Sequence, residues 1–213
     1  MEHLIHEIEQ DALHTAFMTG VKRIDSRVLD AMRAIDRRHF VRPRDVNLAY
    51  GDYPLDIGYG QTISQPFIVA LVTHLIEPKP TDKVLEVGSG SGYQAAILSK
   101  LCQKVFGIEV IEALCEQARK NLAAANIENV TIVFGDGSLG LKEEAPFDKI
   151  IVSAASSKLP SPLLDQLVVG GMLVMPKQSS PADQMLIMIK KTSKTESTIK
   201  DILPVRFVPL INL

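Results

Sequence analysis

The clearest sign of the fold is the sequence of residues 84–92, Val84-Leu85-Glu86-Val87-Gly88-Ser89-Gly90-Ser91-Gly92. An apolar run leads straight into closely spaced glycines, and a helical pattern follows from Tyr93. Glycine is needed where the backbone takes a positive φ or lets a ligand approach the main chain closely. The stretch therefore predicts a buried strand, a ligand-binding turn and a helix, which together form the repeating unit of an α/β sheet.

The spacing of the glycines narrows the choice of ligand. It reads GxGxG with an acidic residue, Glu86, two places before the first glycine. A dinucleotide fingerprint reads GxGxxG, and a phosphate-binding P-loop ends in Lys followed by Ser or Thr. The loop thus favours a nucleoside without a pyrophosphate, of which S-adenosylmethionine is the common one. The alternative is a turn that only packs a helix on a strand.

Carboxylates follow the next two apolar runs. Glu109 closes the second, where it can accept both ribose hydroxyls, and Asp136 follows the third, where it can accept from an adenine amino group. Taken alone, each has a simpler interpretation, as a surface glutamate and as an Asp-Gly turn. Together they favour a binding site, because ligands of open α/β sheets bind at the carboxyl ends of the strands.

The chain around this unit alternates strand and helix patterns, which predicts a mostly parallel sheet covered by helices. Past Gly170-Gly171 the helical patterns stop, which predicts an antiparallel C-terminal extension of the sheet. The predicted strands are Lys83–Val87, Lys104–Ile108, Val130–Phe134, Lys149–Ser153, Met172–Met175, Gln184–Lys190 and Ile199–Pro209, and the helices between them are Tyr93–Leu101, Ile111–Ala125 and Pro162–Leu167.

The N-terminal part predicts helices at Leu4–Met18 and Val28–Ile35, then an irregular loop over residues 43–63. A third helix is expected over Pro66–Ile76, because proline suits the first position of a helix. We expect a single domain over residues 1–213. Its parts are the N-terminal helices and substrate loop (1–80), the cofactor-binding core (81–170) and the C-terminal strands (171–213).

Composition argues against several classes of protein. A net charge of −2 without a basic stripe disfavours nucleic acid as a partner. The two cysteines are too few for a disulfide framework, and the acidic N-terminus does not look like a signal peptide, so we expect a cytoplasmic protein. The longest apolar stretch, Phe67–Ile76, is about half the ~20 residues of a membrane span, so no membrane partner is expected. The histidines show no metal-ligand spacing, and no metal is expected.

Several motifs carry a resemblance to a known family. They are Gly58-Tyr59-Gly60-Gln61-Thr62-Ile63-Ser64-Gln65-Pro66, Glu86 to Gln94, Gly135-Asp136-Gly137, Ala145-Pro146-Phe147-Asp148, Leu164-Asp165-Gln166-Leu167 and Arg206-Phe207-Val208-Pro209-Leu210. Through them the chain resembles the protein-L-isoaspartate (D-aspartate) O-methyltransferases over nearly its whole length. The first motif is close to specific for this family. One segment departs from the family, since Met175–Ser179 replaces a small glycine-containing turn.

The resemblance implies a Rossmann-like class I S-adenosylmethionine-dependent methyltransferase. Its expected reaction is methylation of the free α-carboxylate of L-isoaspartyl residues in damaged peptides and proteins, with S-adenosyl-L-homocysteine as the product. By the same resemblance, Ser64 is the active-site serine. The expected cofactor-binding residues are Glu86, Gly88, Ser89, Gly90, Gly92, Glu109, Val110, Asp136 and Gly137, and the expected peptide-binding residues are Gln61, Thr62, Ile63, Val208, Pro209 and Leu210.

The chemistry of such a transfer fits the residues available. A carboxylate is already a nucleophile at neutral pH, so neither a strong base nor a metal is required. Pro66 places Ser64 at or just before a helix N-terminus, where free N–H groups and the dipole favour an anion. We expect its hydroxyl to orient the substrate carboxylate, and the alternative is that Ser64 is only an N-cap. We expect the peptide to pair with a strand at Val205–Leu210.

Two other functions stay open. The first keeps the fold and changes the acceptor to a small molecule or a base. Amine chemistry is disfavoured, because Val152–Ser156 lacks the Asn or Asp, prolines and aromatic residue that hold an amine. The second is a cofactor-binding module without catalysis, which would not need the intact segment around Ser64.

Overall fold

The centre of the molecule is an open twisted sheet. In the computed structural model, which describes residues 1–180 and 183–211, its seven strands lie in the order β5-β4-β3-β6-β7-β8-β9. Strands β3 to β7 are parallel, and β8 and β9 are antiparallel to their neighbours. The predicted fold class is confirmed. The strands are β3 (Lys83–Val87), β4 (Lys104–Glu109), β5 (Val130–Phe134), β6 (Phe147–Val152), β7 (Leu167–Ser180), β8 (Asp183–Lys191) and β9 (Ser197–Pro204).

The order of the strands creates a crevice beside β3. From β3 the chain passes to β4 and β5 at one edge, then returns to β6 on the other side of β3. Open α/β sheets bind ligands at such a reversal, outside the carboxyl ends of the strands. The glycine loop follows β3 and therefore lies at this crevice.

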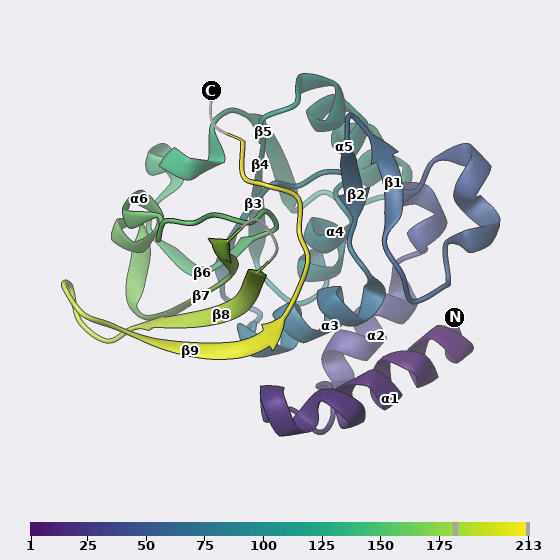
Figure 1. The fold of residues 1–213 in the computed structure, drawn as a ribbon. Coiled ribbons are helices and arrows are strands. Elements are labelled where there is room, and N and C mark those ends of the chain that lie inside the picture. The colour runs from purple at the N-terminus through teal and green to yellow at the C-terminus, as the bar shows by residue number, and fades with distance from the viewer. Residues whose placement is uncertain (181–182, 212–213) are drawn as a thin grey trace.

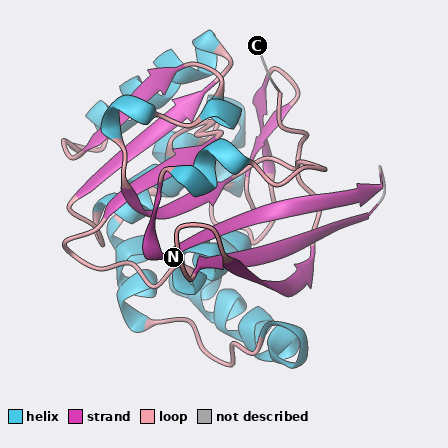
Figure 2. Ribbon diagram, turned by 90° about the vertical axis from the view of Figure 1, so that its left-hand side faces the viewer, coloured by secondary structure: helices cyan, strands magenta, loops and turns pink. Residues whose placement is uncertain are grey.

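Helices cover both faces of the sheet (Figure 2). Alternate residues of each strand point to opposite faces. Val84 and Val105 accordingly pack in one core with α1 to α5, whereas Leu85 and Phe106 pack in a second core with α6. The helices are α1 (Glu2–Thr19), α2 (Ser26–Ala34), α3 (Pro66–Leu75), α4 (Tyr93–Ser99), α5 (Glu112–Ala124) and α6 (Ser161–Asp165).

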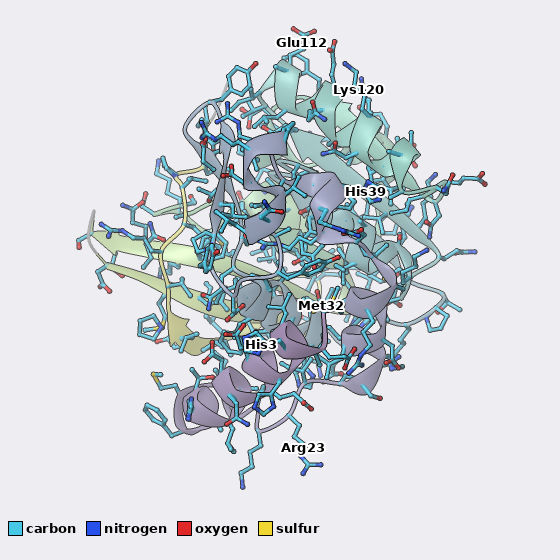
Figure 3. All side chains as sticks on the ribbon, turned by 90° about the vertical axis from the view of Figure 1, so that its right-hand side faces the viewer. His3, Arg23, Met32, His39, Glu112 and Lys120 are labelled. Carbon is cyan, nitrogen blue, oxygen red and sulfur yellow. The ribbon has the colours of Figure 1, made fainter. Side chains whose placement is uncertain are left out.

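Helix α5 illustrates how these helices pack. Cys115, Ala118 and Leu122 recur at helical spacing and are buried in the core. Glu112 and Lys120, on the opposite face, point away from the molecule (Figure 3). In the described part of the chain, no helix combines the length and the apolarity that a membrane crossing needs.

The segment between α2 and α3 is more regular than the expected loop over residues 43–63. It contains two 3₁₀ helices, η1 (Arg37–Phe40) and η2 (Pro43–Leu48), and an antiparallel hairpin of β1 (Leu55–Gly58) and β2 (Gln61–Ile63). The hairpin turn runs through Gly58, Tyr59 and Gly60, all with positive φ. Strands of four and three residues are too short to show an alternating pattern, which is why the prediction missed them.

The C-terminal elements differ from the prediction in their bounds. Helix α6 is shorter than Pro162–Leu167, and β7 is much longer than Met172–Met175. The glycine pair lies inside β7, where Gly170 takes φ 86° beside a shift in the register with β6. Such a bulge bends a strand without ending it. The departing segment Met175–Ser179 also lies in β7.

The last segment is not a strand as far as Pro209. Strand β9 ends at Pro204, and the following chain runs back across the carboxyl ends of the sheet (Figure 1). It is fixed there because Ala155 donates to Val208 O at 2.8 Å and accepts from Leu210 N at 2.8 Å. Proline has no N–H for a ladder, which helps to explain why the strand stops at Pro204.

Candidate active site

A cavity of about 750 Å³, counting the space open to solvent, lies at the carboxyl ends of β3 and β4. The hairpin, the glycine loop and the C-terminal segment form its walls. All but two of the predicted site residues line it: Gln61, Thr62, Ile63, Ser64, Glu86, Gly88, Ser89, Gly90, Glu109, Val110, Gly137, Val208, Pro209 and Leu210. The exceptions are Gly92 and Asp136, which are not among the lining residues.

The glycine loop has the backbone that its sequence requires. Gly88, Gly90 and Gly92 take φ of 82°, 51° and 88°. A Cβ on Gly92 would lie 3.4 Å from the Cβ of Ala118. Gly92 directly precedes α4, and its positive φ favours glycine there, so its contact with the cofactor stays a prediction.

Glu109 holds the glycine loop in place. Its Oε2 accepts from Gly90 N at 2.8 Å, and its Oε1 accepts from Ile111 N at 3.0 Å. A carboxylate oxygen has two lone pairs, so each oxygen retains capacity for a further donor. The geometry is compatible with the predicted hydrogen bonds to ribose hydroxyls.

Glu86 is a buried carboxyl in the wall of the cavity. Among the described residues, its Oε2 has no hydrogen-bond partner. Burial raises the pKa of Glu86 to about 8, Ser89 opposes the rise and the charge of Glu109 adds to it. A buried acceptor of this kind fits a cationic donor, and the methionine part of S-adenosylmethionine carries an ammonium group.

Asp136 lies at the carboxyl end of β5 and caps the 3₁₀ helix η3 (Gly137–Leu139). Its Oδ1 accepts from Ser138 N at 2.9 Å. Gly137 reaches the cavity, and a Cβ there would lie 2.4 Å from Cγ1 of Val87. The structure thus explains the glycine by packing, and the adenine contact of Asp136 stays a prediction.

Ser64 is half-buried and lies two residues before the start of α3, as expected. The cap of α3 comes from another residue. Phe67 N donates to Oδ1 of Asp52 at 2.7 Å, and Nε2 of Gln65 donates to its Oδ2 at 2.8 Å. The alternative that Ser64 is the N-cap is wrong. The expected open anion site at this helix N-terminus is also wrong, because the Asp52 carboxylate already occupies it.

A second cavity, a groove of about 1380 Å³ including open space, adjoins the first. Its walls come from α1, the hairpin region, the start of α3 and the C-terminal segment. Both cavities are lined by four residues: Thr62, Ser64, Ser153 and Val208. Ser64 therefore lies where the two cavities meet.

Some lining residues were not predicted. Ser153 follows β6, and its position after the fourth parallel strand could have identified it. Asp11 and Thr15 line the groove from α1, where helical periodicity carries no sign of a site. Burial and a hydrogen bond with Asp52 raise the pKa of Asp11.

Among the described residues, no group of three or more His, Cys, Asp or Glu could hold a metal ion.

The fold and the cavity define a Rossmann-like methyltransferase that uses S-adenosylmethionine. The sequence model described as Protein-L-isoaspartate(D-aspartate) O-methyltransferase matches residues 9–213, and the chain belongs to this family.

Relatives of known sequence and structure agree with this assignment. Protein-L-isoaspartate O-methyltransferase 2 of Syntrophobacter fumaroxidans is 45% identical over 207 residues, which cover 97% of this chain and 84% of the relative. Protein-L-isoaspartate O-methyltransferase of Paracoccus denitrificans is 48% identical over 187 residues, covering 88% and 86%. A candidate protein-L-isoaspartate O-methyltransferase of Plasmodium falciparum, crystallised with S-adenosyl-L-homocysteine, has a TM-score of 0.80 at 27% identity, covering 98% and 99%.

Proposed function

We propose that the chain repairs damaged protein by transferring the methyl group of S-adenosylmethionine to the free α-carboxylate of L-isoaspartyl residues, at the point where its two cavities meet. One observation supports this placement above others. Ser64 lines both the cavity at the glycine loop and the adjoining groove. A group at that junction can touch an acceptor held on one side and a donor held on the other.

The cofactor is assigned to the cavity at the glycine loop. Glu86 would accept from the ammonium group, Glu109 from the ribose hydroxyls and Asp136 from the adenine amino group. Backbone at Gly88, Ser89 and Gly90 would approach the ligand, and Val110 and Gly137 would complete the wall. When bound, the cofactor supplies a methyl group on a sulfonium, which a carboxylate oxygen attacks with displacement of a neutral thioether.

The role of Ser64 is to orient the acceptor. Its hydroxyl would donate to one oxygen of the isoaspartyl carboxylate and direct the other oxygen toward the cofactor cavity. No proton moves in this transfer, so a catalytic base is unnecessary. Alignment and exclusion of water supply the rate enhancement, and the hairpin that carries Thr62 helps to exclude water.

The peptide is assigned to the groove. Of the predicted peptide-binding residues, Thr62 and Val208 line the groove, whereas Gln61, Ile63, Pro209 and Leu210 line the adjoining cavity at the glycine loop. The groove runs between α1, the hairpin region, the start of α3 and the C-terminal segment, so an extended acceptor can lie along it. Residues 205–210 offer fewer free main-chain N–H groups for pairing with a peptide than expected. Val205 N donates to Gln184 O at 3.0 Å, and Phe207 N donates to its Oε1 at 2.6 Å.

The alternate residues of that segment remain candidates for pairing with the peptide. Among the described residues, the N–H groups of Arg206 and Val208 have no partner in the protein. Recognition through main-chain groups would make little use of the side chains of the peptide, which suits a lesion that arises in many sequences.

We also propose a cytoplasmic location and no nucleic-acid partner. The net charge of −2 and the free, buried Cys102 and Cys115 support these two assignments.

The test of this assignment is Ser64→Ala, assayed on an L-isoaspartyl peptide with saturating cofactor. Loss of one oriented donor should lower kcat about 10²-fold, by analogy with loss of an oxyanion donor. Binding of S-adenosyl-L-homocysteine and the melting temperature should stay near wild type. Ser197→Ala, which removes an exposed hydroxyl on β9, is the matched control. A folded Ser64→Ala protein with wild-type turnover would remove Ser64 from the reaction.

A further inference from the structure

Arg37 is a fully buried cation that forms no ion pair with any residue that the structure describes. Its side chain is 0% exposed, and four carbonyl oxygens of the protein accept its N–H groups. Burial lowers the pKa of Arg37 from its ordinary value, opposed in part by Tyr93 and Asp52. Burying a charge among neutral groups costs several kcal/mol unless its hydrogen bonds are well made. Packing in the core does not by itself explain why a charged side chain is buried at this position.

The guanidinium joins both ends of the β1–β2 hairpin. Its Nη2 donates to Tyr53 O at 3.3 Å and to Ser64 O at 3.0 Å. These two residues flank Leu55–Ile63, the span of the hairpin. Nη1 adds Ala49 O at 2.7 Å, which ties down the segment leading into the hairpin. One side chain thus closes the base of the hairpin and fixes the main chain at Ser64.

The same guanidinium packs against the first residue of α4, the helix that follows the glycine loop. Its central carbon lies 5.6 Å from the ring centroid of Tyr93, a cation–π distance. Tyr93 is the first residue of α4, directly after the glycine loop, and it lines the cofactor cavity. Phe40 supports the ring from another side, with centroids 5.5 Å apart. Arg37 therefore contacts the Ser64 segment on one side and the cofactor side of the site on the other.

We propose that Arg37 is a positioning residue for the methyl transfer, and that it sets the distance between Ser64 and the glycine loop. The proposal rests on the function proposed above. Only arginine has a planar fork that can reach several carbonyl oxygens and also stack on a ring. A lysine would keep the positive charge but could not hold Tyr53 O and Ser64 O together over Tyr93.

The experiment compares Arg37→Lys with Arg119→Lys. Arg119 is the matched control, because its Nε and Nη2 also donate to a carbonyl, that of Ile132, at 3.0 and 2.7 Å, and it lines neither cavity of the site. Both variants and wild type are assayed with saturating S-adenosylmethionine and an isoaspartyl peptide, well below their melting temperatures. Binding of S-adenosyl-L-homocysteine is measured separately, and hydrogen exchange is followed over residues 53–66.

Arg37→Lys should lower kcat about tenfold or more, since small misplacements of a catalytic group have large effects. Its dissociation constant for S-adenosyl-L-homocysteine should rise less than about threefold, because the glycine loop is unchanged. Exchange over residues 53–66 should become faster, and exchange over α5 should not. Arg119→Lys should keep kcat within about twofold of wild type.

Two results would overturn the proposal: a folded Arg37→Lys protein with kcat within about twofold of wild type, or equal loss of kcat and of cofactor affinity. If Arg37→Lys does not fold, Arg37→Gln, which keeps two amide donors, is measured in the same way and judged by the same results. An inactive wild type would instead contradict the proposed function. Hydrogen exchange over the hairpin still tests the clamp in that case, because it does not depend on activity.

Discussion

Replacing Glu86 by glutamine should remove the main pH dependence that burial gives this protein. The ordinary pKa of the carboxyl is 4.5, and burial raises the pKa of Glu86 to about 8 in the folded chain. The folded protein thus binds this proton more tightly than the unfolded chain does. The contribution to stability is fully present below about pH 4.5 and is lost as the pH rises through about 8.

The expected size follows from the same two values. A carboxyl whose pKa rises from 4.5 to about 8 loses about 4 to 5 kcal/mol of unfolding free energy over that range, at about 1.4 kcal/mol per pH unit. Glutamine has nearly the same shape and no charge. The difference in unfolding free energy between Glu86→Gln and wild type should therefore grow by about 2 to 3 kcal/mol from pH 5 to pH 7 in the absence of cofactor.

The assay is urea denaturation of both proteins at several pH values between 5 and 8. Glu128→Gln, which replaces an exposed carboxyl, is the control for loss of a charge elsewhere. Wild type should also release about one proton when it binds S-adenosyl-L-homocysteine at pH 7, measured by calorimetry in two buffers of different ionisation enthalpy, because the ligand ammonium favours ionised Glu86. Parallel unfolding profiles for Glu86→Gln and wild type would show that ionisation of Glu86 does not cause the pH dependence.

Two further substitutions test other contacts. Asp52→Ala should lower the free energy of unfolding by about 1–2 kcal/mol, because Asp52 caps α3. Ser64→Ala should change the same free energy by less than about 0.5 kcal/mol. If urea denaturation showed the larger loss for Ser64→Ala, the assignment of Asp52 as the cap would be contradicted. Gly90→Ala should weaken binding of S-adenosyl-L-homocysteine about tenfold, since the new Cβ would lie 3.1 Å from Cδ1 of Ile57 at φ +51°. The control is Gly170→Ala, which has φ +86° and open space, and equal affinities of the two variants in calorimetry would argue against the contact.

Much of the fold could be predicted, because local patterns specify it. The run ending at Val87 and the glycines after it mark a strand, a turn and a helix without reference to the rest of the chain. The carboxyl-end rule for open sheets then brings Glu86 and Glu109 to one cavity. Motif resemblance added Ser64, whose neighbours alone would have suggested an N-cap.

The rest depended on contacts between residues distant in the sequence. The cap of α3 comes from Asp52, fifteen residues before Phe67, and no local signal links the two. Asp11 reaches the groove only because α1 packs beside α3. Arg37 looks like one of several surface arginines in its own segment, and its burial follows from the way the hairpin folds over it. Such long-range contacts leave no periodic pattern to read.

The activity proposed for this site is methylation of an isoaspartyl carboxylate. The most direct measurement is methyl transfer from labelled S-adenosylmethionine to one synthetic peptide made in two forms, with L-aspartate and with L-isoaspartate at the same position. We predict a base-labile methyl ester on the isoaspartyl form only. Equal labelling of both forms, or labelling of neither while S-adenosyl-L-homocysteine still binds, would contradict this activity.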